Sequence, residues 1–165
     1  MQVSIDNGFN KQNVPIGGTM PAKTASLQYV TGLSFVATAD SHHAVILDSS
    51  VSDEPTSAPS PIEMLLIALG GCTGTDVVMI LKKKRVDFSG LEVKLTGERR
   101  EEQPRTYTKV HVEYLVHGDD VQPRDVERAI ELSADKYCSV SAMFRQAGVA
   151  LSHSYRIMGT PQRRR

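Results

Sequence analysis

The sequence predicts an α+β protein, and the order of two kinds of segment carries this prediction. Several short segments alternate apolar and polar residues, which is the period of a half-buried β-strand. A long apolar segment and a shorter amphipathic one stand between them, each with a helical start signal. The order is strands, helix, strands, helix and strand, without an internal repeat, and it is typical of α+β architectures.

The length of 165 residues suits one domain with its own core. We expect an N-terminal arm or loop over residues 1–24, which are rich in Asn, Gly, Pro and Gln. A single domain then covers residues 25–158, and a basic tail follows over 159–165. The content of 40 % hydrophobic and 23 % charged residues is that of an ordinary globular protein.

The charge balance argues against two classes of partner. Nineteen basic residues offset nineteen acidic ones, so no net field attracts nucleic acid or an anionic membrane surface. Trp is absent and aromatic residues make up 5 %, which also disfavours base stacking. The N-terminal segment does not have the pattern of a signal peptide, and we therefore expect a cytoplasmic protein.

The first strands are expected over residues 27–30, 33–37 and 44–47, joined by short turns into an antiparallel meander. A polar, Pro-rich loop follows over residues 49–61. In the second half, strands are expected at residues 91–95, 110–116 and 149–157, with a charged hairpin tip between the first two.

The long helix begins with a recognisable cap. Ser60 stands at the N-cap position, with Pro and then Glu63 in the first turn, which is the pattern of a capping box. An apolar run follows over residues 64–81, and basic residues at 82–85 suit a helix C-terminus. The run is long enough to span a membrane, but Asp76 and three glycines within it favour the central helix of a folded domain.

A second helix is expected from Pro123, and a further short one over residues 139–147. The apolar face of the second helix follows helical spacing up to Cys138, through Val126, Ala129, Ile130, Ser133 and Tyr137.

Local motifs for cofactors are missing. The sequence has no CxxC and no HExxH pair, so a metal site would have to be assembled from distant residues. Glycines 70, 71 and 74 lie inside the long helix, and neither a phosphate loop, a dinucleotide fingerprint nor a GxSxG elbow is present. We therefore expect no metal and no organic cofactor.

The two cysteines remain as candidates for chemistry. A permanent disulfide is not expected in a reducing compartment, so Cys72 and Cys138 are either inert core thiols or a redox pair. Cys72 lies in mid-helix, where the helix dipole gives little help, and Asp76 four positions later would raise its pKa. Cys138 is better placed by local structure, because it directly precedes a predicted helix start.

Two segments resemble a known family. The stretch SPIEMLLIALGGCTGTDVVMILKKKR, with KYCSVSAMF placing a second cysteine 66 positions after the first, resembles the OsmC/Ohr proteins. These are the osmotically inducible and organic hydroperoxide resistance proteins. The resemblance spans about residues 25–157, and the LGGCT form is most similar to the OsmC-like branch. It implies an OsmC-like fold, with antiparallel sheets wrapped around a long central helix, in an intertwined homodimer with two sites at its interface.

The resemblance also implies a chemistry. The Cys72 thiolate would attack the O–O bond of an organic hydroperoxide and become a sulfenic acid, an alcohol would leave, and Cys138 would resolve the product as a disulfide. An external dithiol would then reduce that disulfide. In the peroxidase branches a catalytic Glu follows the helix-opening Pro, whereas Ile62 stands here and Glu63 comes next. Both a catalytic and a capping role for Glu63 stay open.

A second departure concerns the cation. The family's activating Arg comes from the N-terminal strands, but the first arginine of this chain is Arg85. Two alternatives to the redox hypothesis therefore stay open. The protein could keep the fold without any catalytic activity, or it could be a non-catalytic protein that binds an apolar small molecule. The binding cleft would lie in the dimer and be lined by Met64, Leu65, Leu69, Met79 and Met143. The glycines around Cys72 would allow close approach of a neighbouring segment or leave room for a substrate.

Overall fold

A computed structural model describes residues 20–50 and 55–159 of the chain. It divides the chain into two compact units, residues 1–47 and residues 48–165, which are described separately. The predicted arm lies mostly, and the predicted basic tail almost wholly, outside the described residues.

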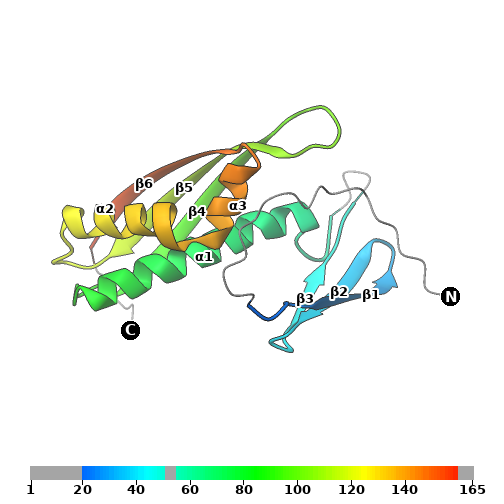
Figure 1. The fold of residues 1–165 in the computed structure, drawn as a ribbon, viewed down its shortest axis with the longest axis horizontal. Helices are drawn as coiled ribbons and strands as arrows, with labels where there is room; N and C mark the ends of the chain where they lie inside the picture. The colour runs from blue at the N-terminus through cyan, green and yellow to red at the C-terminus, as the bar shows by residue number, and fades with distance from the viewer. Residues whose placement is uncertain (1–19, 51–54, 160–165) are drawn as a thin grey trace. The chain divides into compact units, whose positions relative to one another are not determined.

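The N-terminal unit contains the predicted antiparallel meander (Figure 1). Its strands are β1 (Ala25–Thr31), β2 (Ser34–Ala39) and β3 (Ala44–Leu47). Gly32 adopts a φ of 56° in the first turn, a conformation that favours glycine.

One face of this small sheet is apolar. Tyr29 is paired directly with Phe35, and Leu27 with Ala37, so these side chains point to the same side. Val45, opposite Ala37, extends the same face on β3. The exposed fraction is 55 % for Leu27 and 64 % for Tyr29. This unit therefore leaves its own apolar face uncovered.

The C-terminal unit is a helical layer on a three-stranded sheet (Figure 1). The sheet has the order β4 (Gly90–Arg99), β5 (Tyr107–His117) and β6 (Ala150–Met158). The helical layer consists of α1 (Pro61–Lys83), α2 (Pro123–Leu132), η1 (Ser133–Tyr137) and α3 (Ser139–Gln146). Alternate residues of β5, among them Val110, Val112 and Val116, are buried in the core beneath this layer.

Helix α1 begins with the predicted capping box. The Ser60 Oγ accepts the Glu63 backbone N–H at 3.4 Å, and the Glu63 carboxylate accepts the Ser60 backbone N–H at 2.8 Å. By length and composition alone α1 could cross a membrane, but core helices of water-soluble folds pass the same test. Leu69, Val77 and Leu81 of α1 are fully buried in the core of this unit.

The expectation of wholly antiparallel sheets is wrong for one strand pair. β4 pairs antiparallel with β5, but β5 pairs parallel with β6, with Val112 opposite His153. The chain between β5 and β6 passes through α2, η1 and α3 on one face of the sheet. Such a helical crossover returns the chain in its original direction, so the next strand pairs in parallel.

The second predicted helix is interrupted. An α-helix ends at Leu132, and a π-helical turn follows over Ser133–Tyr137, in which the Cys138 N–H bonds to the Ser133 carbonyl. The wider i→i+5 turn changes the helical phase. Ser133 is buried as predicted, but Tyr137 is turned to solvent with an exposed fraction of 50 %.

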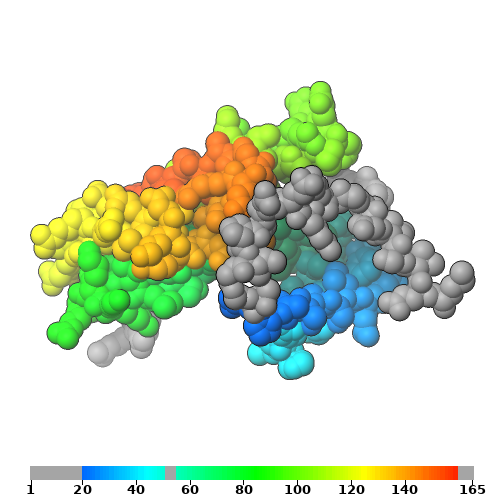
Figure 2. Space-filling model, in the orientation of Figure 1, coloured from blue at the N-terminus to red at the C-terminus, as the bar shows by residue number. Residues whose placement is uncertain are grey.

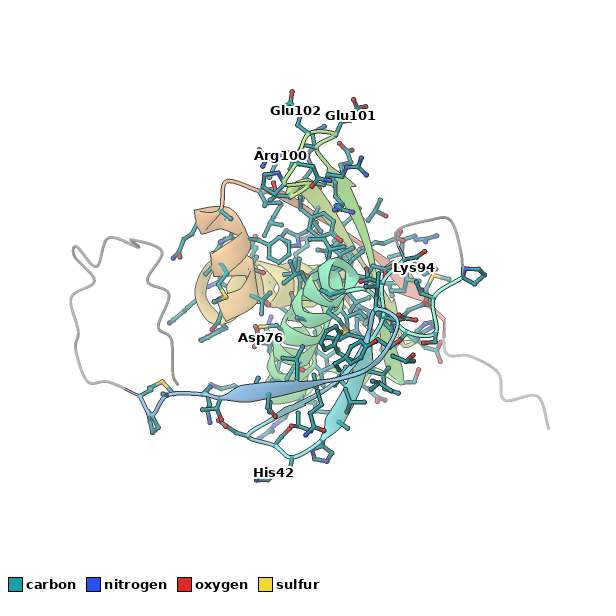
Figure 3. The ribbon with its side chains drawn as sticks, turned by 90° about the vertical axis from the view of Figure 1, so that its right-hand side faces the viewer. His42, Asp76, Lys94, Arg100, Glu101 and Glu102 are labelled. Atoms are coloured by element: carbon teal, nitrogen blue, oxygen red, sulfur yellow. The ribbon has the colours of Figure 1, made fainter. Side chains whose placement is uncertain are left out.

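The predicted charged tip joins β4 to β5. The tip projects from the body of the C-terminal unit (Figure 2). Arg100, Glu101 and Glu102 lie at its outer end (Figure 3). This segment is therefore remote from the buried core of the unit.

Candidate thiol site between α1, η1 and α3

Two of the three glycines around Cys72 let α1 approach the sheet. A methyl group added at Gly70 would lie 2.7 Å from a Leu95 side-chain carbon, and one at Gly74 would lie 3.3 Å from a Val93 methyl. Gly71 has no neighbouring atom within 4 Å of that position in the described chain. Close packing on β4 therefore explains Gly70 and Gly74, and Gly71 lies on another side of the helix.

The structure brings the two cysteines together. The Sγ atoms of Cys72 and Cys138 and a carboxylate oxygen of Asp76 all lie within 4.8 Å of one another. Cys72 and Asp76 are four positions apart on α1 and so share one face of the helix. Cys138 reaches the same point from the junction of η1 and α3, and Figure 3 shows Asp76 on the flank of α1. Cys138 has an exposed fraction of 3 %, whereas Cys72 is half-buried.

A backbone N–H group at the start of α3 points at the Cys138 sulfur. Cys138 is the N-cap of α3, as the sequence predicts, and its Sγ accepts the Ser141 N–H at 3.3 Å. N–H groups at a helix N-terminus favour negative charge nearby, and the Val140 N–H accordingly acts to lower the pKa of Cys72.

The pKa of Cys72 is nevertheless raised above its ordinary value. Burial is the largest cause, and the hydrogen bond with Cys138 adds to it, while the Val140 N–H opposes the rise. Negative charge on Cys138 and Asp76 raises this pKa further. No Lys or Arg of the described residues is among the groups that shift it. The activating cation that the sequence lacks is therefore not replaced from within the described part of one chain.

A chain of hydrogen-bonded side chains leads away from Asp76 into the core. Ser133 Oγ donates to Asp76 Oδ2 at 2.9 Å, Thr73 Oγ1 lies 2.9 Å from Ser133 Oγ, and Tyr114 OH lies 2.6 Å from Thr73 Oγ1. His153 Nδ1 completes the chain, 3.4 Å from Tyr114 OH. Thr73 and Ser133 are fully buried, so this network satisfies polar groups that would otherwise be costly.

The chain of hydrogen bonds has one direction. Each hydroxyl has a single proton, and that of Ser133 goes to Asp76, so Thr73 donates to Ser133 and Tyr114 donates to Thr73. His153 Nδ1 is then the donor to Tyr114. Burial raises the pKa of Tyr114 to about 12, which keeps its proton in place. Burial also lowers the pKa of His153, which favours the neutral ring.

An open hollow adjoins the thiol site. It has a volume of about 410 Å³ and is lined by Asp76, Met79, Ile80, Lys83 and Tyr137. Asp76 belongs to both the hollow and the thiol cluster, and Tyr137 directly precedes Cys138. A small molecule in this hollow would meet the apolar side chains of Met79 and Ile80 as well as Lys83 and Asp76.

A second, apolar cavity of about 290 Å³ lies elsewhere in the C-terminal unit. Leu65 and Met143, both predicted as cleft residues, line it together with Ile62, Tyr107 and Phe144. Leu69 does not line it, because its side chain is fully buried in the core. The predicted cleft residues therefore belong to separate places in the structure.

Glu63 does not join the cysteines. It precedes Cys72 by nine positions, about 14 Å along a helix axis. Its carboxylate is held by the N–H and the hydroxyl of Ser60, and these hydrogen bonds lower the pKa of Glu63. The geometry supports the capping role, and a catalytic role for Glu63 stays a prediction.

Sequence reasoning missed most of the polar network. Thr73 carried a signal, because it is a polar residue inside an apolar helical run. Ser133 falls at the helical spacing of a buried face, and Tyr114 at the strand spacing of one. These patterns indicate burial, but they do not indicate that the three hydroxyls meet.

Comparison with known proteins identifies the family of this chain. The sequence model of the family described as OsmC-like protein matches residues 53–154. The protein YhfA of Escherichia coli strain K12 is 46 % identical over 134 residues, which is 81 % of this chain and 97 % of YhfA.

Solved structures show the same fold. The crystal structure of a hypothetical protein from Aquifex aeolicus is 30 % identical, with a TM-score of 0.76 over 86 % of this chain and all of that one. An organic hydroperoxide resistance protein OsmC from Legionella pneumophila matches at a TM-score of 0.59 and 12 % identity, over 84 % of this chain and 98 % of that one. From its sequence and its fold, the chain belongs to the OsmC-like protein family.

Proposed function

We propose that this protein is a thiol-dependent redox protein that reduces organic hydroperoxides through Cys72 and Cys138. The observation that carries the proposal is the approach of the two sulfurs to within 4.8 Å, from positions 66 residues apart. A disulfide has an S–S distance of about 2.05 Å, so the two sulfurs move toward each other when the bond forms. Fold neighbours named as organic hydroperoxide resistance proteins support the class of reaction.

The proposed reaction has two steps on the protein. The Cys72 thiolate attacks the terminal oxygen of the hydroperoxide, the O–O bond breaks, and the departing alkoxide takes up a proton to leave as an alcohol. Cys72 is then a sulfenic acid. The Cys138 thiolate attacks that sulfur, hydroxide leaves as water after protonation, and a disulfide forms. An external dithiol reduces the disulfide and restores both thiols.

Exposure supports Cys72 as the attacking residue. Cys72 is half-buried, whereas Cys138 is almost inaccessible at 3 % exposure. The Val140 N–H favours negative charge on Cys72, although its pKa is raised overall. Met79 and Ile80 give the adjoining hollow apolar walls, which suit an organic peroxide better than hydrogen peroxide.

The proposed assembly is a homodimer. The exposed apolar face of the β1–β2–β3 sheet is not covered within its own unit, and a contiguous exposed apolar face is typical of an interaction surface. A second copy of the chain supplies that surface in our proposal. A cytoplasmic location, without nucleic acid or membrane partners, stays a prediction.

The apolar cavity supports a second candidate function. Its lining by Ile62, Leu65, Phe144 and Val149 suits a small apolar molecule, and it lies apart from the thiols. In this function the thiols are packing residues. Slow alkylation of both cysteines, together with saturable binding of an apolar fluorescent probe, would favour it.

The deciding experiment is mass spectrometry of the reduced protein after addition of one equivalent of cumene hydroperoxide or of hydrogen peroxide. We expect a Cys72–Cys138 disulfide within seconds with the organic peroxide and more slowly with hydrogen peroxide. Cys138→Ser should instead accumulate a sulfenic acid at Cys72, and Cys72→Ser should not react. The absence of oxidation over many minutes would refute the proposed function.

A further inference from the structure

Two thiols and a carboxylate converge at one point of the C-terminal unit. The candidate ligand atoms of Cys72, Asp76 and Cys138 lie within 4.8 Å of one another. Each group is an anion when deprotonated. Among the residues that the structure describes, no Lys or Arg forms an ion pair with Asp76. The site thus gathers three groups that become anionic ligands on losing their protons, and no described Lys or Arg is paired with its carboxylate.

The donor set selects a class of metal. Zn²⁺ accepts both thiolate and carboxylate ligands, whereas Mg²⁺ and Ca²⁺ prefer oxygen ligands alone. In a tetrahedral site with Zn–S bonds of about 2.3 Å, neighbouring sulfurs lie about 3.8 Å apart. A sulfur and a carboxylate oxygen on the same ion would lie about 3.5 Å apart, so the donors, which lie within 4.8 Å, need to approach one another by about 1.3 Å at most.

The surroundings of the cluster resemble the outer shell of a metal site. Asp76 is oriented by the Ser133 hydroxyl, which is fixed in turn by Thr73. Ligands of bound metals are commonly held by such hydrogen bonds. The Ser141 N–H holds the Cys138 sulfur in the same way.

An unpartnered hydroxyl provides a second observation. Ser141 is fully buried, and its Oγ has no hydrogen-bond partner among the described residues. It belongs to the residue whose backbone N–H contacts the Cys138 sulfur. A buried hydroxyl without a partner calls for a water or an ion nearby.

We propose that Cys72, Asp76 and Cys138 bind one Zn²⁺ ion through two sulfurs and a carboxylate oxygen, with the fourth position open to water. Each thiol releases its proton to solvent as its Zn–S bond forms. The zinc-bound and disulfide states exclude each other, because both use the same two sulfurs. This proposal replaces the expectation of no metal, which rested on the lack of local motifs, and it does not depend on hydroperoxide reduction.

The test is an anaerobic titration of the reduced full-length protein with Co²⁺, followed by competition with Zn²⁺. We expect saturation at one equivalent, with thiolate-to-cobalt charge-transfer absorption and the visible bands of a tetrahedral site. Zn²⁺ should abolish these bands and protect both thiols from alkylation. A weakly buffered titration should record two protons released for each Zn²⁺ bound.

Three variants separate this site from adventitious binding. Asp76→Asn keeps an oxygen acceptor for Ser133 but removes the charge, and we expect it to weaken Zn²⁺ binding about 10- to 100-fold. Cys138→Ser should abolish the charge-transfer bands at that sulfur. Asp135→Asn changes an exposed acid of the neighbouring turn and should bind like the unchanged protein, with circular dichroism verifying the fold of each variant.

Two results would overturn the zinc proposal. One is the absence of charge-transfer bands in the unchanged protein, and the other is equal affinity of the Asp76→Asn and Asp135→Asn variants. The Asp76→Asn result stands even if Cys138→Ser fails to fold. Oxidation by cumene hydroperoxide is measured separately in the presence of a chelator, so failure of one proposal is distinguished from failure of the other.

Discussion

At the scale of single residues, Asp76 works against the thiolate of Cys72. Its charge is one of the causes that raise the pKa of Cys72, although a smaller one than burial. We expect Asp76→Asn to lower this pKa and so to increase the thiolate fraction near neutral pH. The pH dependence of iodoacetamide alkylation, with the modified cysteine located by mass spectrometry, measures the shift.

Asp135→Asn is the matched control for this change. Asp135 is not among the groups that shift the Cys72 pKa, and its carboxylate lies 3.5 Å from Arg145. The same pH dependence of alkylation for both variants would show that the Asp76 charge does not affect the pKa of Cys72.

Glu63 is expected to make the free energy of unfolding depend on pH in the acid range. Its pKa is lowered by the hydrogen bonds from Ser60, so its contribution to the free energy of unfolding is complete above the unfolded pKa, about 4.3. That contribution is lost as the pH falls through the lower folded pKa. Glu63→Gln should flatten this acid limb, and Ser60→Ala should cost about 1 kcal/mol near neutral pH. Urea titrations at several pH values measure both effects.

The peroxide assay decides between the two roles of Glu63. Because Glu63 lies far along the helix from the sulfurs, we expect Glu63→Gln to oxidise at the rate of the unchanged protein. A large fall in the rate of Cys72 oxidation, in a variant that remains folded, would restore the catalytic interpretation.

The individual residues of the site differ in how far the sequence predicts them. Cys72 and Cys138 could be named, because cysteine is rare here and its chemistry is distinctive. The approach of Ser133 to Asp76 could not, because serine occurs in many roles and the contact joins residues 57 positions apart. Such contacts depend on how the elements pack, and no local pattern records that.

At the scale of elements, the glycines of α1 make a paired prediction. Gly71→Ala adds a methyl group in open space and should stabilise the helix by about 0.5–1 kcal/mol. Gly70→Ala has the same gain in helix propensity but must displace Leu95, because the added carbon would lie 2.7 Å from its side chain. Thermal unfolding should therefore rank Gly71→Ala above Gly70→Ala.

The reverse ranking would contradict this account of α1. A lower stability of Gly71→Ala would locate a partner surface at Gly71, because the described chain places no atom within 4 Å of the added carbon.

The helices and strands themselves are well predicted, because caps and alternation are local signals. Helix α1 begins at Pro61 behind its Ser60 cap, and β5 spans the predicted alternating run. The parallel pairing of β6 was not predicted, since it follows from the path of the crossover. The π turn was missed because its composition is that of an α-helix.

At the scale of the whole molecule, the exposed face of the first sheet predicts a dimer. Sedimentation should give the mass of two chains at micromolar concentration. Tyr29→Lys places a charge on the apolar face and should shift the equilibrium toward monomer. Gln28→Lys, on the opposite face of the same strand, is the control and should leave the mass unchanged. A monomer in the unchanged protein would contradict the proposed assembly.

The π turn at Ser133–Tyr137 also affects how the position of Cys138 depends on the number of residues in this stretch. Such a turn holds one residue more than an α-helical turn. Deleting the exposed Lys136 should turn the bond from the Cys138 N–H to the Ser133 carbonyl into an ordinary i→i+4 bond. Cys138 would keep its direction, because five residues of a π turn and four of an α turn both make about one turn, and peroxide should still link the two sulfurs. The 66-residue interval between the cysteines would thus tolerate a change of one residue at this place, because the turn absorbs it.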